Sequence, residues 1–503
     1  MSDGRTAENV SAEQLPRRAD ELLVGGYRLA LVAAHHDAGR ELRVVYLFLA
    51  PHPAPRVELR LPVDAADPVV PSLAARSFAA GRFEREMHDL YGIIPVDHPL
   101  PRRLVRHPHW PAGWYPMRHD AGLPEFGPSD DAFPFLTVEG RGVYEIPVGP
   151  VHAGLIEPGH FRFSVVGETI LKLKARLWYV HKGIEKLFEG RELAGALPLA
   201  ERISGDTAVG HTLAYCRAVE DALELAVPDD VKRGRAILLE LERLYNHIAD
   251  IGALCNDVGH GILHSHALRI REALLRLNAD TTGHRLLRDG ILVGGVTLRR
   301  VPDPDRLAAI AADIREVVDL ALGNTLVAER FTGTAVLTAA EARDLGALGY
   351  VARASGIDVD ARRDHPTLDL SQFELDLADV LTVPIQERGD VMARFAQRVA
   401  EIDASFALLD VLCRTVTPGA VNDQAAVPRG AGPVSGVGIV EGWRGTIVHR
   451  VEIGPDHRIT RNKIVDPSWF NWPALPVALA DTIVPDFPLV NKSFNLSYAG
   501  NDL

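Results

Sequence analysis

The feature that most restricts the fold of this chain is an apolar repeat near its middle. Seven apolar residues recur there at steps of mostly three or four: Ile237, Leu238, Leu241, Leu244, Ile248, Ile251 and Leu254. This period places their side chains on one face of an α-helix. Residues 306–328 and 391–416 show the same pattern. The sequence therefore predicts several long helices in the second part of the chain.

The first part of the chain mixes strand and helix signals. Residues 44–50 form an apolar run of strand length, and residues 56–62 alternate between apolar and polar side chains. Residues 72–91 carry apolar side chains at helical spacing. Residues 95–116 are dense in Pro, His and Arg, which favours an extended arm over a core element.

The mixed strand and helix signals of the first part and the helical patterns of the second part predict an α+β protein. We expect an N-terminal α/β domain over residues 1–125, a linker over 126–141, and a mostly helical domain with small β-sheets over 142–503. A chain of 503 residues is long enough to bury large cores without a disulfide or a structural metal.

Composition excludes several classes of protein. The formal net charge is −13, which argues against nucleic acid as a partner because such a footprint needs clustered Lys and Arg. The three cysteines, Cys216, Cys255 and Cys413, form no CxxC pair, so a disulfide framework and a four-thiolate site are both excluded. No signal-peptide segment is evident, and no apolar stretch reaches the ~18–20 residues of a membrane span. We expect a chain that is soluble or peripheral.

A glycine-rich turn over residues 149–163 carries two histidines and a carboxylate. His152, Glu157 and His160 lie close together in the sequence, and His and a partly buried Glu can both titrate near neutral pH. The three residues are therefore candidates for a proton-handling cluster. Histidines in turns are often only exposed polar side chains, and the residues alone leave that alternative open.

Three other polar motifs can be interpreted either as functional sites or as ordinary solvent-exposed side chains. Residues 83–103 join a charged helix end to a basic arm, which can bind an acidic partner or simply be solvated. Residues 179–190 are expected to form a solvated helix face. His260, His264 and His266 favour ordinary helix histidines over a metal site, because no HExxH-like carboxylate accompanies them.

Residues 427–436 combine a proline-fixed turn with a glycine-rich segment. Arg429 can point a fixed cation into a cavity, and a surface turn is the alternative. The glycine spacing is similar to that of a dinucleotide-binding loop, but we do not predict such a loop. The segment contains Pro433 and leads into a strand pattern instead of a helix.

Several strings, taken together, resemble a known family. FEREMHDLYGI, HPLPRRL and HPHWPAGWYPMRHD resemble the C-type subunit of respiratory complex I. The later strings resemble the D-type subunit and, more closely, the large subunit of membrane-bound NiFe hydrogenases of the formate hydrogenlyase and hydrogenase-4 component G type. These strings are GPVHAGLIEPGHFRF, HKGIEKLFEGRELAGALPLAERISG, LLELERLYNHIADIG, VPRGAGPVSG, EGWRGTIVHRVEI and DPSWFNWPAL. Their order is the family's order, so the resemblance implies a fused C-type and D-type subunit.

The resemblance stops at the residues that hold the metals. NiFe hydrogenases bind nickel and iron through two pairs of cysteines, because soft thiolates suit both metals. Where the family has its first pair, this chain reads RISGDT, with Ser204 and Thr207 at the ligand positions. Where it has the second, the chain reads NLSYAG, with Ser497 and Gly500. The resemblance therefore implies a hydrogenase-like fold in which this chain binds no metal.

The resemblance also implies roles for polar residues around the missing metal. His160 matches a histidine that binds quinone in complex I, and Gly205 stands where its companion tyrosine belongs. The resemblance implies four catalytic residues. Glu157 matches a glutamate of the proton path, and His160 matches the quinone histidine. His211 matches the histidine after the first ligand pair, and Arg429 matches the arginine above the metal. The implied quinone or acceptor cavity is lined by His152, His160, Ser204, Gly205, Thr207 and Ser497.

From this resemblance we expect an oxidoreductase subunit of a membrane-associated, complex I-like assembly (NADH–quinone oxidoreductase-like) that passes electrons to quinone or another acceptor without hydrogenase chemistry. No cofactor is expected on this chain. The implied partners are a small B-type subunit that holds an iron–sulfur cluster, antiporter-like and other membrane subunits, and a separate subunit for any NAD. The implied location is peripheral, on the cytoplasmic face of the cell membrane. The alternative is a structural scaffold whose active cavity has decayed.

Overall fold

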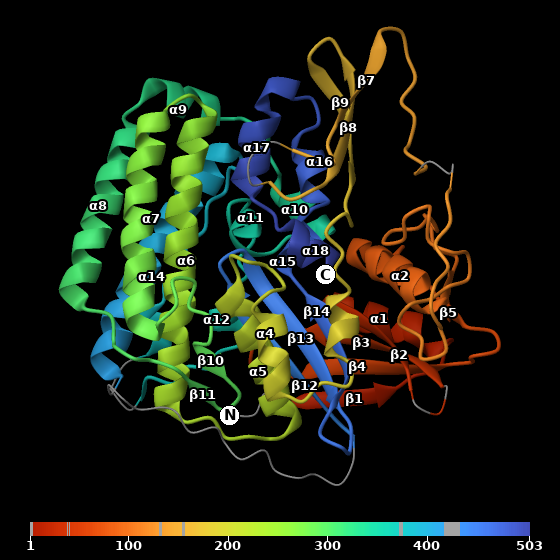
Figure 1. The fold of residues 1–503 in the computed structure, drawn as a ribbon. Helices are drawn as coiled ribbons and strands as arrows, with labels where there is room; N and C mark the ends of the chain where they lie inside the picture. The colour runs from red at the N-terminus through yellow and green to blue at the C-terminus, as the bar shows by residue number, and fades with distance from the viewer. Residues whose placement is uncertain are drawn as a thin grey trace.

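The computed structural model describes residues 4–37, 39, 41–129, 133–152, 156–371, 376–416 and 433–503. Figure 1 shows the N-terminal strands at the lower right, a bundle of long helices on the left, and a blue C-terminal sheet between them. The mixture of helices and small sheets confirms the predicted α+β class. The predicted domain boundaries stay a prediction.

The N-terminal part is built on one four-stranded sheet. Its strand order is β1-β4-β3-β2, in which β1 is parallel to β4 and the other neighbours are antiparallel. The elements of this part are β1 (Arg5–Asn9), α1 (Gln14–Val24), β2 (Arg28–His36), β3 (Leu42–Leu49), β4 (Arg56–Val63), β5 (Val69–Pro71), α2 (Phe78–Tyr91) and β6 (Ile94–Val96).

The strand predictions in this part are confirmed, and the helix prediction is partly wrong. The strands predicted at 44–50 and 56–62 correspond to β3 and β4, but the helix predicted over 72–91 begins only at Phe78. The preceding residues form a turn instead, because the carboxylate of Glu84 accepts hydrogen bonds from the Ser72 hydroxyl and the Leu73 N–H, both at 2.6 Å. A side chain from within the helix therefore fixes the segment before it.

A second, smaller sheet begins at Val143. Its three antiparallel strands, in the order β7-β8-β9, project from the top of the molecule in Figure 1. The strands are β7 (Val143–Val148), β8 (His160–Val166) and β9 (Thr169–Arg176). The short helices α3 (Ile184–Phe188) and α4 (Leu197–Ala200) then lead to the helical part.

Long helices form the left side of the molecule. The predicted helix around 237–254 is confirmed as the centre of α6, and the helix at 391–416 is confirmed as α14. The sequence predicts one helix at 306–328, but the structure divides it between two, because the Asn324 side chain caps a new helix by accepting a 3.2 Å hydrogen bond from Val327 N–H. The elements are α5 (Ala208–Ala222), α6 (Asp229–Asp257), α7 (Gly261–Thr282), β10 (Ile291–Leu292), β11 (Gly295–Val296), α8 (Pro304–Leu322), α9 (Thr325–Phe331), α10 (Ala339–Leu345), α11 (Gly349–Arg353), α12 (Ala361–Asp364), α13 (Leu377–Val380) and α14 (Val391–Thr415).

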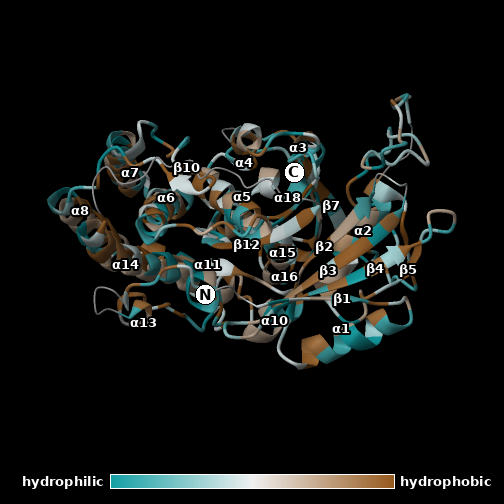
Figure 2. Ribbon diagram, turned by 90° about the horizontal axis from the view of Figure 1, so that it is seen from below, coloured by the Kyte–Doolittle hydropathy of each residue, from teal (hydrophilic) through white to brown (hydrophobic). Residues whose placement is uncertain are grey.

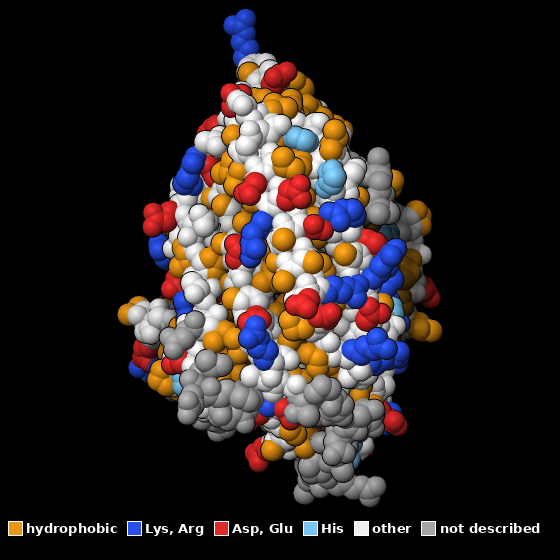
Figure 3. All heavy atoms as spheres, turned by 90° about the vertical axis from the view of Figure 1, so that its left-hand side faces the viewer, with side chains coloured by type: hydrophobic (Ala, Val, Ile, Leu, Met, Phe, Trp, Pro, Cys, Tyr) orange, Lys and Arg blue, Asp and Glu red, His pale blue; other side chains and the backbone are white. Residues whose placement is uncertain are grey.

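The outer face of the bundle carries polar and apolar side chains together. Figure 3 shows that acidic and basic side chains are interspersed with apolar ones on this face, which Figure 1 presents on its left. Among the described residues, none of the helices is both long and apolar enough to cross a bilayer.

The C-terminal part returns through the centre of the molecule. Its antiparallel sheet has the order β12-β13-β14 and carries α5 on one face. The residues from Asp466 onward show no periodicity in the sequence, yet they form several α-helices that are each too short to repeat a pattern. The elements are β12 (Val434–Gly442), β13 (Gly445–Ile453), β14 (Ile459–Val465), α15 (Pro467–Asn471), α16 (Ala474–Ala478), α17 (Phe487–Phe494) and α18 (Tyr498–Asp502).

Buried ion pairs join the N-terminal sheet to this central sheet, which lies between the N-terminal sheet and the bundle in Figure 2. Arg450 of β13 donates to both carboxylate oxygens of Glu58 on β4, at 3.1 and 3.3 Å, and both side chains are at most 1% exposed. Arg5 adds a third contact to Glu58 at 3.0 Å. Lys463 of β14 contacts Glu86 of α2 at 2.8 Å. The two parts of the chain therefore form one packed unit.

Several charged side chains in residues 83–103 and 179–190 are buried and have partners. In α2, Asp89 accepts hydrogen bonds from the N–H groups of Leu104, Val105 and Arg106, which fixes the basic arm to the helix. In residues 179–190, Glu185 is buried and paired with Arg461 at 2.7 Å. The expectation of a solvated face at 179–190 is wrong for Glu185, because an arginine from β14 neutralises its charge.

We expect Glu58→Gln to destabilise the whole chain by about 3–5 kcal/mol, because it leaves buried arginines without their carboxylate. Burial raises the pKa of Glu58, but the guanidinium groups of Arg450 and Arg5 outweigh burial and hold it at about 2. A depressed carboxyl pKa stabilises the fold above the unfolded-state value of about 4.5. The difference between wild type and variant, measured by urea unfolding, should therefore shrink as pH falls from about 4.5 towards 2.

Glu272→Gln is the matched control. Arg285 and Arg276 hold the pKa of Glu272 at about 2 through hydrogen bonds, but this pair lies on the surface, where solvent screens it. We expect no measurable change in the urea midpoint. Equal effects of the two substitutions would contradict the role assigned to the buried pair.

Candidate functional site

Two segments that are distant in the sequence meet beside the N-terminus of α5. The hydroxyls of Ser204 and Ser497 are 2.8 Å apart, although 293 positions separate them, and both residues are 4% exposed. Ser497 is the N-cap of α18, and its hydroxyl accepts the Gly500 N–H at 2.8 Å. The structure therefore brings residues from both predicted ligand segments into direct contact.

An ion pair lies at the centre of this contact. Asp206 accepts two hydrogen bonds from Arg444, from Nη1 to Oδ1 at 2.7 Å and from Nη2 to Oδ2 at 2.6 Å. Its Oδ1 also accepts the Ser204 hydroxyl at 2.9 Å and the Thr207 hydroxyl at 3.1 Å. Burial opposes ionisation, but the adjacent guanidinium lowers the pKa of Asp206 to about 2. The carboxylate is therefore charged at every physiological pH.

Arg444 links three parts of the chain. It lies in the turn between β12 and β13, and its Nε donates to the Asn495 carbonyl at 2.6 Å. Its guanidinium stacks over Trp443 at 3.9 Å from the ring centroid. The Trp443 indole N–H in turn donates to the Asp206 carbonyl at 2.9 Å. One turn of the central sheet thus holds both the 204–207 segment and the C-terminal segment.

A row of buried side chains continues from this ion pair into the protein. His211 Nε2 lies 3.0 Å from the Asp466 carboxylate, and its Nδ1 lies 3.1 Å from His449 Nε2. A carboxylate only accepts, so Nε2 of His211 carries hydrogen, and a neutral His211 then accepts from His449. His449 Nδ1 can take the Asn462 amide hydrogen at 3.4 Å. Burial, with His211 as a neighbour, holds the pKa of His449 well below its usual value.

Glu242 of α6 caps α5 from a neighbouring helix. Its carboxylate accepts the N–H of Val209 at 2.7 Å and the N–H of Gly210 at 2.9 Å, which have no partner inside the first turn of α5. The side chain is fully buried, and burial raises the pKa of Glu242 to about 8. A protonatable carboxyl therefore lies next to the Asp206 segment.

The predicted histidines fix the turn between β7 and β8. His152 Nε2 lies 2.7 Å from the Gly159 carbonyl, so this nitrogen donates and the ring closes the turn. His160 Nδ1 lies 3.1 Å from the Gly149 carbonyl and donates in the same way. Its Nε2 is buried and has no hydrogen-bond partner among the described residues. His160 therefore keeps a buried acceptor nitrogen when neutral.

The same turn contacts the residues that follow Ser497. The Glu157 carboxylate accepts the Ala499 N–H at 3.0 Å. Gly159 lies against the ring of Tyr498, so closely that a Cβ at Gly159 would come within 2.6 Å of it. Glu157, the turn that bears His160, and the Ser204–Ser497 contact therefore surround the first turn of α18.

Gly205 and Arg429 complete the set of predicted residues. Gly205 is exposed, and a Cβ added to it would meet no atom within 4 Å. Arg429 lies outside the described residues. The arginine observed at this site is Arg444, which lies within EGWRGTIVHRVEI and received no role from the sequence. Asp206 was missed as well, although its place between Ser204 and Thr207 was a usable signal.

The side chains at the four ligand positions do not fit a NiFe centre. Ser204, Thr207 and Ser497 offer neutral hydroxyls that bond to one another or to Asp206, and Gly500 offers no side chain. A Cβ at Gly500 would lie 2.6 Å from the carboxyl carbon of Asp466. Nickel and iron in such centres require soft thiolate donors. A guanidinium–carboxylate pair supplies the charges at these positions instead.

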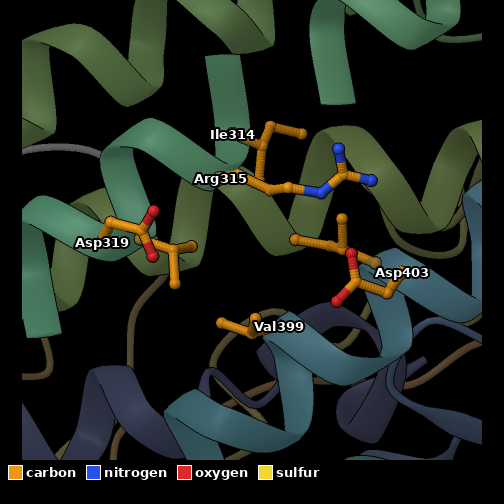
Figure 4. Close-up of a pocket in the computed structure, with 7 residues that line it drawn as sticks. Ile314, Arg315, Asp319, Val399 and Asp403 are labelled. Atoms are coloured by element: carbon orange, nitrogen blue, oxygen red, sulfur yellow. The ribbon is translucent and has the colours of Figure 1, made fainter. Parts of the chain in front are cut away.

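Two other features lie apart from these residues. Among the described residues, His35, Asp37 and Glu452 have donor atoms within 4.8 Å of one another. Arg43 donates to Asp37 at 2.7 Å and to Glu452 at 3.0 Å, so a cation of the protein itself already binds this group. A shallow pocket between α8 and α14, shown in Figure 4, is lined by a few apolar residues with Arg315 and two aspartates at its rim.

The fold defines a class of protein in which a C-type-like sheet domain packs on a D-type-like helical domain. Residues 9–126 match the 30 kDa subunit family of respiratory-chain NADH dehydrogenase, and residues 257–433 match the 49 kDa subunit family. The chain is 31% identical to formate hydrogenlyase subunit 5 of Escherichia coli (strain K12), covering 89% of this chain and 79% of that protein. It is 33% identical to hydrogenase-4 component G of the same organism, covering 88% and 77%.

More distant relatives agree with this assignment. The C/D subunit of NADH-quinone oxidoreductase from Bacteroides thetaiotaomicron is 30% identical to this chain, and the match covers 82% of each protein. A solved chain from the membrane-bound sulfane sulfur reductase, an archaeal respiratory membrane complex, shares the fold with a TM-score of 0.65 at 24% identity, over 72% of this chain and 99% of that chain. This chain belongs to the family of fused complex I C/D-type subunits, which includes formate hydrogenlyase subunit 5 and hydrogenase-4 component G.

We expect Gly500→Ala to destabilise the chain by about 1–3 kcal/mol, because the new methyl group would press on the Asp466 carboxyl carbon. Gly205→Ala is the matched control, since its Cβ would enter open space and we expect little change. Both can be measured as midpoints of urea unfolding. A Gly500→Ala variant as stable as the control would show that this position can accept a larger residue.

Proposed function

We propose that this chain is the acceptor-site subunit of a membrane-associated, complex I-like oxidoreductase that performs no hydrogenase chemistry. It receives electrons from the iron–sulfur cluster of a small partner subunit and passes them to quinone or another acceptor beside residues 204–206. The observation that carries the proposal is the direct contact of Ser204 with Ser497, at 2.8 Å, where the family resemblance places thiolates. Related subunits belong to membrane respiratory complexes.

The donor groups at the site support the absence of hydrogenase chemistry. A serine or threonine hydroxyl stays protonated at neutral pH and cannot act as a bridging thiolate. Asp206 supplies a hard carboxylate, but Arg444 already neutralises it. Hydrogen activation at two thiolate-bridged metals therefore has no ligand set in this chain.

Groups suited to acceptor chemistry remain at the site. His160 has a buried ring nitrogen without a hydrogen-bond partner among the described residues, and an imidazole is a suitable general acid or base beside a carbonyl oxygen. Glu157 lies at the same helix turn as Ser497. The space beside Gly205 is open on the outside of this chain, so a partner packed over it would complete a cavity. Any NAD site belongs to another subunit.

A scaffold without acceptor chemistry is the second candidate. It is favoured by the way in which Ser204, Asp206, Thr207 and Arg444 bond to one another, which leaves few of their polar atoms for a ligand. The first candidate is favoured by the exposed side of Asp206 and by His160 Nε2, which has no hydrogen-bond partner in the part of the chain that the structure describes.

The extended segment between β6 and β8 is the proposed docking surface for the iron–sulfur partner. It exposes several large apolar side chains, which would be unfavourable in water without a partner: Leu123, Phe126, Leu136, Tyr144, Val151 and Ile156. Figure 1 shows the described parts of this segment on the right of the molecule, below and beside the projecting sheet. The proposed location is the cytoplasmic face of the membrane, where antiporter-like membrane subunits are further partners.

We expect His160→Ala to lower quinone-dependent turnover of the purified complex about 100-fold, because a positioned proton donor contributes about that much. His266→Ala, an exposed histidine on α7, is the control and should leave turnover unchanged. Metal analysis of the same complex should find no nickel bound to this subunit. Stoichiometric nickel, or full turnover in His160→Ala with the complex intact, would contradict the proposal.

We expect Leu123→Asp combined with Phe126→Asp to reduce co-purification of the iron–sulfur subunit, because the changes place charges where apolar contact is proposed. Leu123 is 96% exposed and Phe126 is 56% exposed in the isolated chain, so the fold itself should be unaffected. Leu320→Asp, at a 54% exposed residue of α8, is the matched control. The measurement is iron and acid-labile sulfide per copy of the tagged chain, and an unchanged ratio would place the docking surface elsewhere.

A further inference from the structure

The two-stranded sheet of β5 and β6 exposes an apolar face. The strands are parallel, Val69 is paired with Ile94, and Pro71 is paired with Val96. Side chains two residues apart on a strand point to the same face, so these four residues share one face. Val69, Ile94 and Val96 are 39%, 47% and 44% exposed. In Figure 1, β5 lies on the right of the molecule, on the side away from the helical bundle.

The opposite face of the same sheet is buried. Val70 is 1% exposed, and its register partner Pro95 is buried as well. Parallel strands are usually covered on both faces, and their sequences are then apolar at successive positions. The sequences of β5 (VVP) and β6 (IPV) follow this pattern. Because the described residues cover only one face, the strand sequences indicate a further partner on the other.

The outer edge of β6 cannot donate a hydrogen bond to a third strand. In a parallel pair, residues that bond to the neighbouring strand alternate with residues that face outward. Ile94 N–H donates to the Pro68 carbonyl at 2.7 Å, and the Val96 carbonyl accepts the Ser72 N–H at 3.0 Å. Pro95 lies between these two residues and therefore faces outward, and proline has no N–H.

The outer edge of β5 is blocked in the same way. Pro71 has no N–H, and the Val69 N–H already donates to the Asp67 carbonyl at 2.8 Å. Prolines at sheet edges prevent the addition of strands. A partner of this sheet therefore packs on the exposed face instead of extending the sheet.

Carboxylates flank the exposed face at both ends. Asp67 lies two residues before Val69, Asp97 directly follows Val96, and both aspartates are exposed. Because the strands are parallel, the start of β5 and the end of β6 lie at opposite ends of the sheet. The Lys and Arg side chains closest in the sequence bind elsewhere: Arg60 to Glu58 at 3.1 Å, Arg76 to Asp20 at 2.9 Å, and Arg102 to the Pro134 carbonyl at 3.3 Å.

We propose that this face binds an amphipathic helix of another protein subunit, which places apolar side chains on the sheet and a Lys or Arg at each end. A strand of three residues spans about 10 Å, which equals about two turns of an α-helix. A second copy of this chain would bring a formal net charge of −13 to an acidic rim, and an anionic lipid surface would be repelled as well. This contact does not depend on the acceptor chemistry proposed above.

Photo-crosslinking in the whole complex tests this inference. Benzoylphenylalanine is placed at Ile94, and the complex is purified from its natural host. We expect a crosslink to one other subunit, and mass spectrometry should find apolar residues at helical spacing in the crosslinked peptide, with Lys or Arg at both ends. The same group at Leu322 of α8, which is 48% exposed, is the control and should not capture that peptide.

Charge variants test the role of the two aspartates. Asp67→Asn combined with Asp97→Asn should lower the crosslinking yield about fivefold, which corresponds to about 1 kcal/mol for two exposed charge pairs. Raised salt should lower the wild-type yield for the same reason. Asp319→Asn combined with Asp403→Asn, at two exposed aspartates of the bundle, is the matched control and should leave the yield unchanged.

Several outcomes would overturn the inference. They are a crosslink to a second copy of this chain, to lipid or to an acidic segment, and the absence of any crosslink at Ile94. A yield that is the same in wild type and in the variant of Asp67 and Asp97 would also overturn it.

Discussion

The buried ion pair between Arg450 and Glu58 is the contact on which the arrangement of this molecule depends. Arg450 belongs to β13, where successive side chains point to opposite faces of the sheet. Arg450 reaches the N-terminal sheet, and its neighbour His449 points the other way, to His211 on α5. Arg444 lies in the turn before the same strand and holds Asp206. One strand therefore positions the N-terminal domain and the candidate site together.

The candidate site shows how the segments around Ser204 and Ser497 are held together by polar contacts. A metal would connect the two ligand segments by coordination bonds, and here a hydroxyl pair and a salt bridge connect them. The salt bridge is compatible with burial because each charge has its partner and most remaining polar atoms are hydrogen-bonded. What remains open to a ligand is the outer side of Asp206 and the space beside Gly205.

Local patterns predicted those elements whose stability is mainly local. The repeat around Leu241 predicted α6, and the alternation before Pro62 predicted β4. The apolar pattern did not predict the break at Asn324, where a side-chain cap begins a new helix. It also did not predict the helices after Asp466, which are too short to show an apolar repeat. The sequence also misjudged Glu185, because the arginine that neutralises this residue is 276 positions away.

The sequence by itself determined the family, the mixed fold class and the absence of cysteines at positions 204, 207, 497 and 500, because each of these is a property of residue types in order. Only the tertiary structure decided how the residues at those positions are held. The pairing of Asp206 with Arg444 spans 238 residues, and the contact of Ser204 with Ser497 spans 293. Such contacts depend on how the central sheet packs against α5, and no local periodicity encodes that packing.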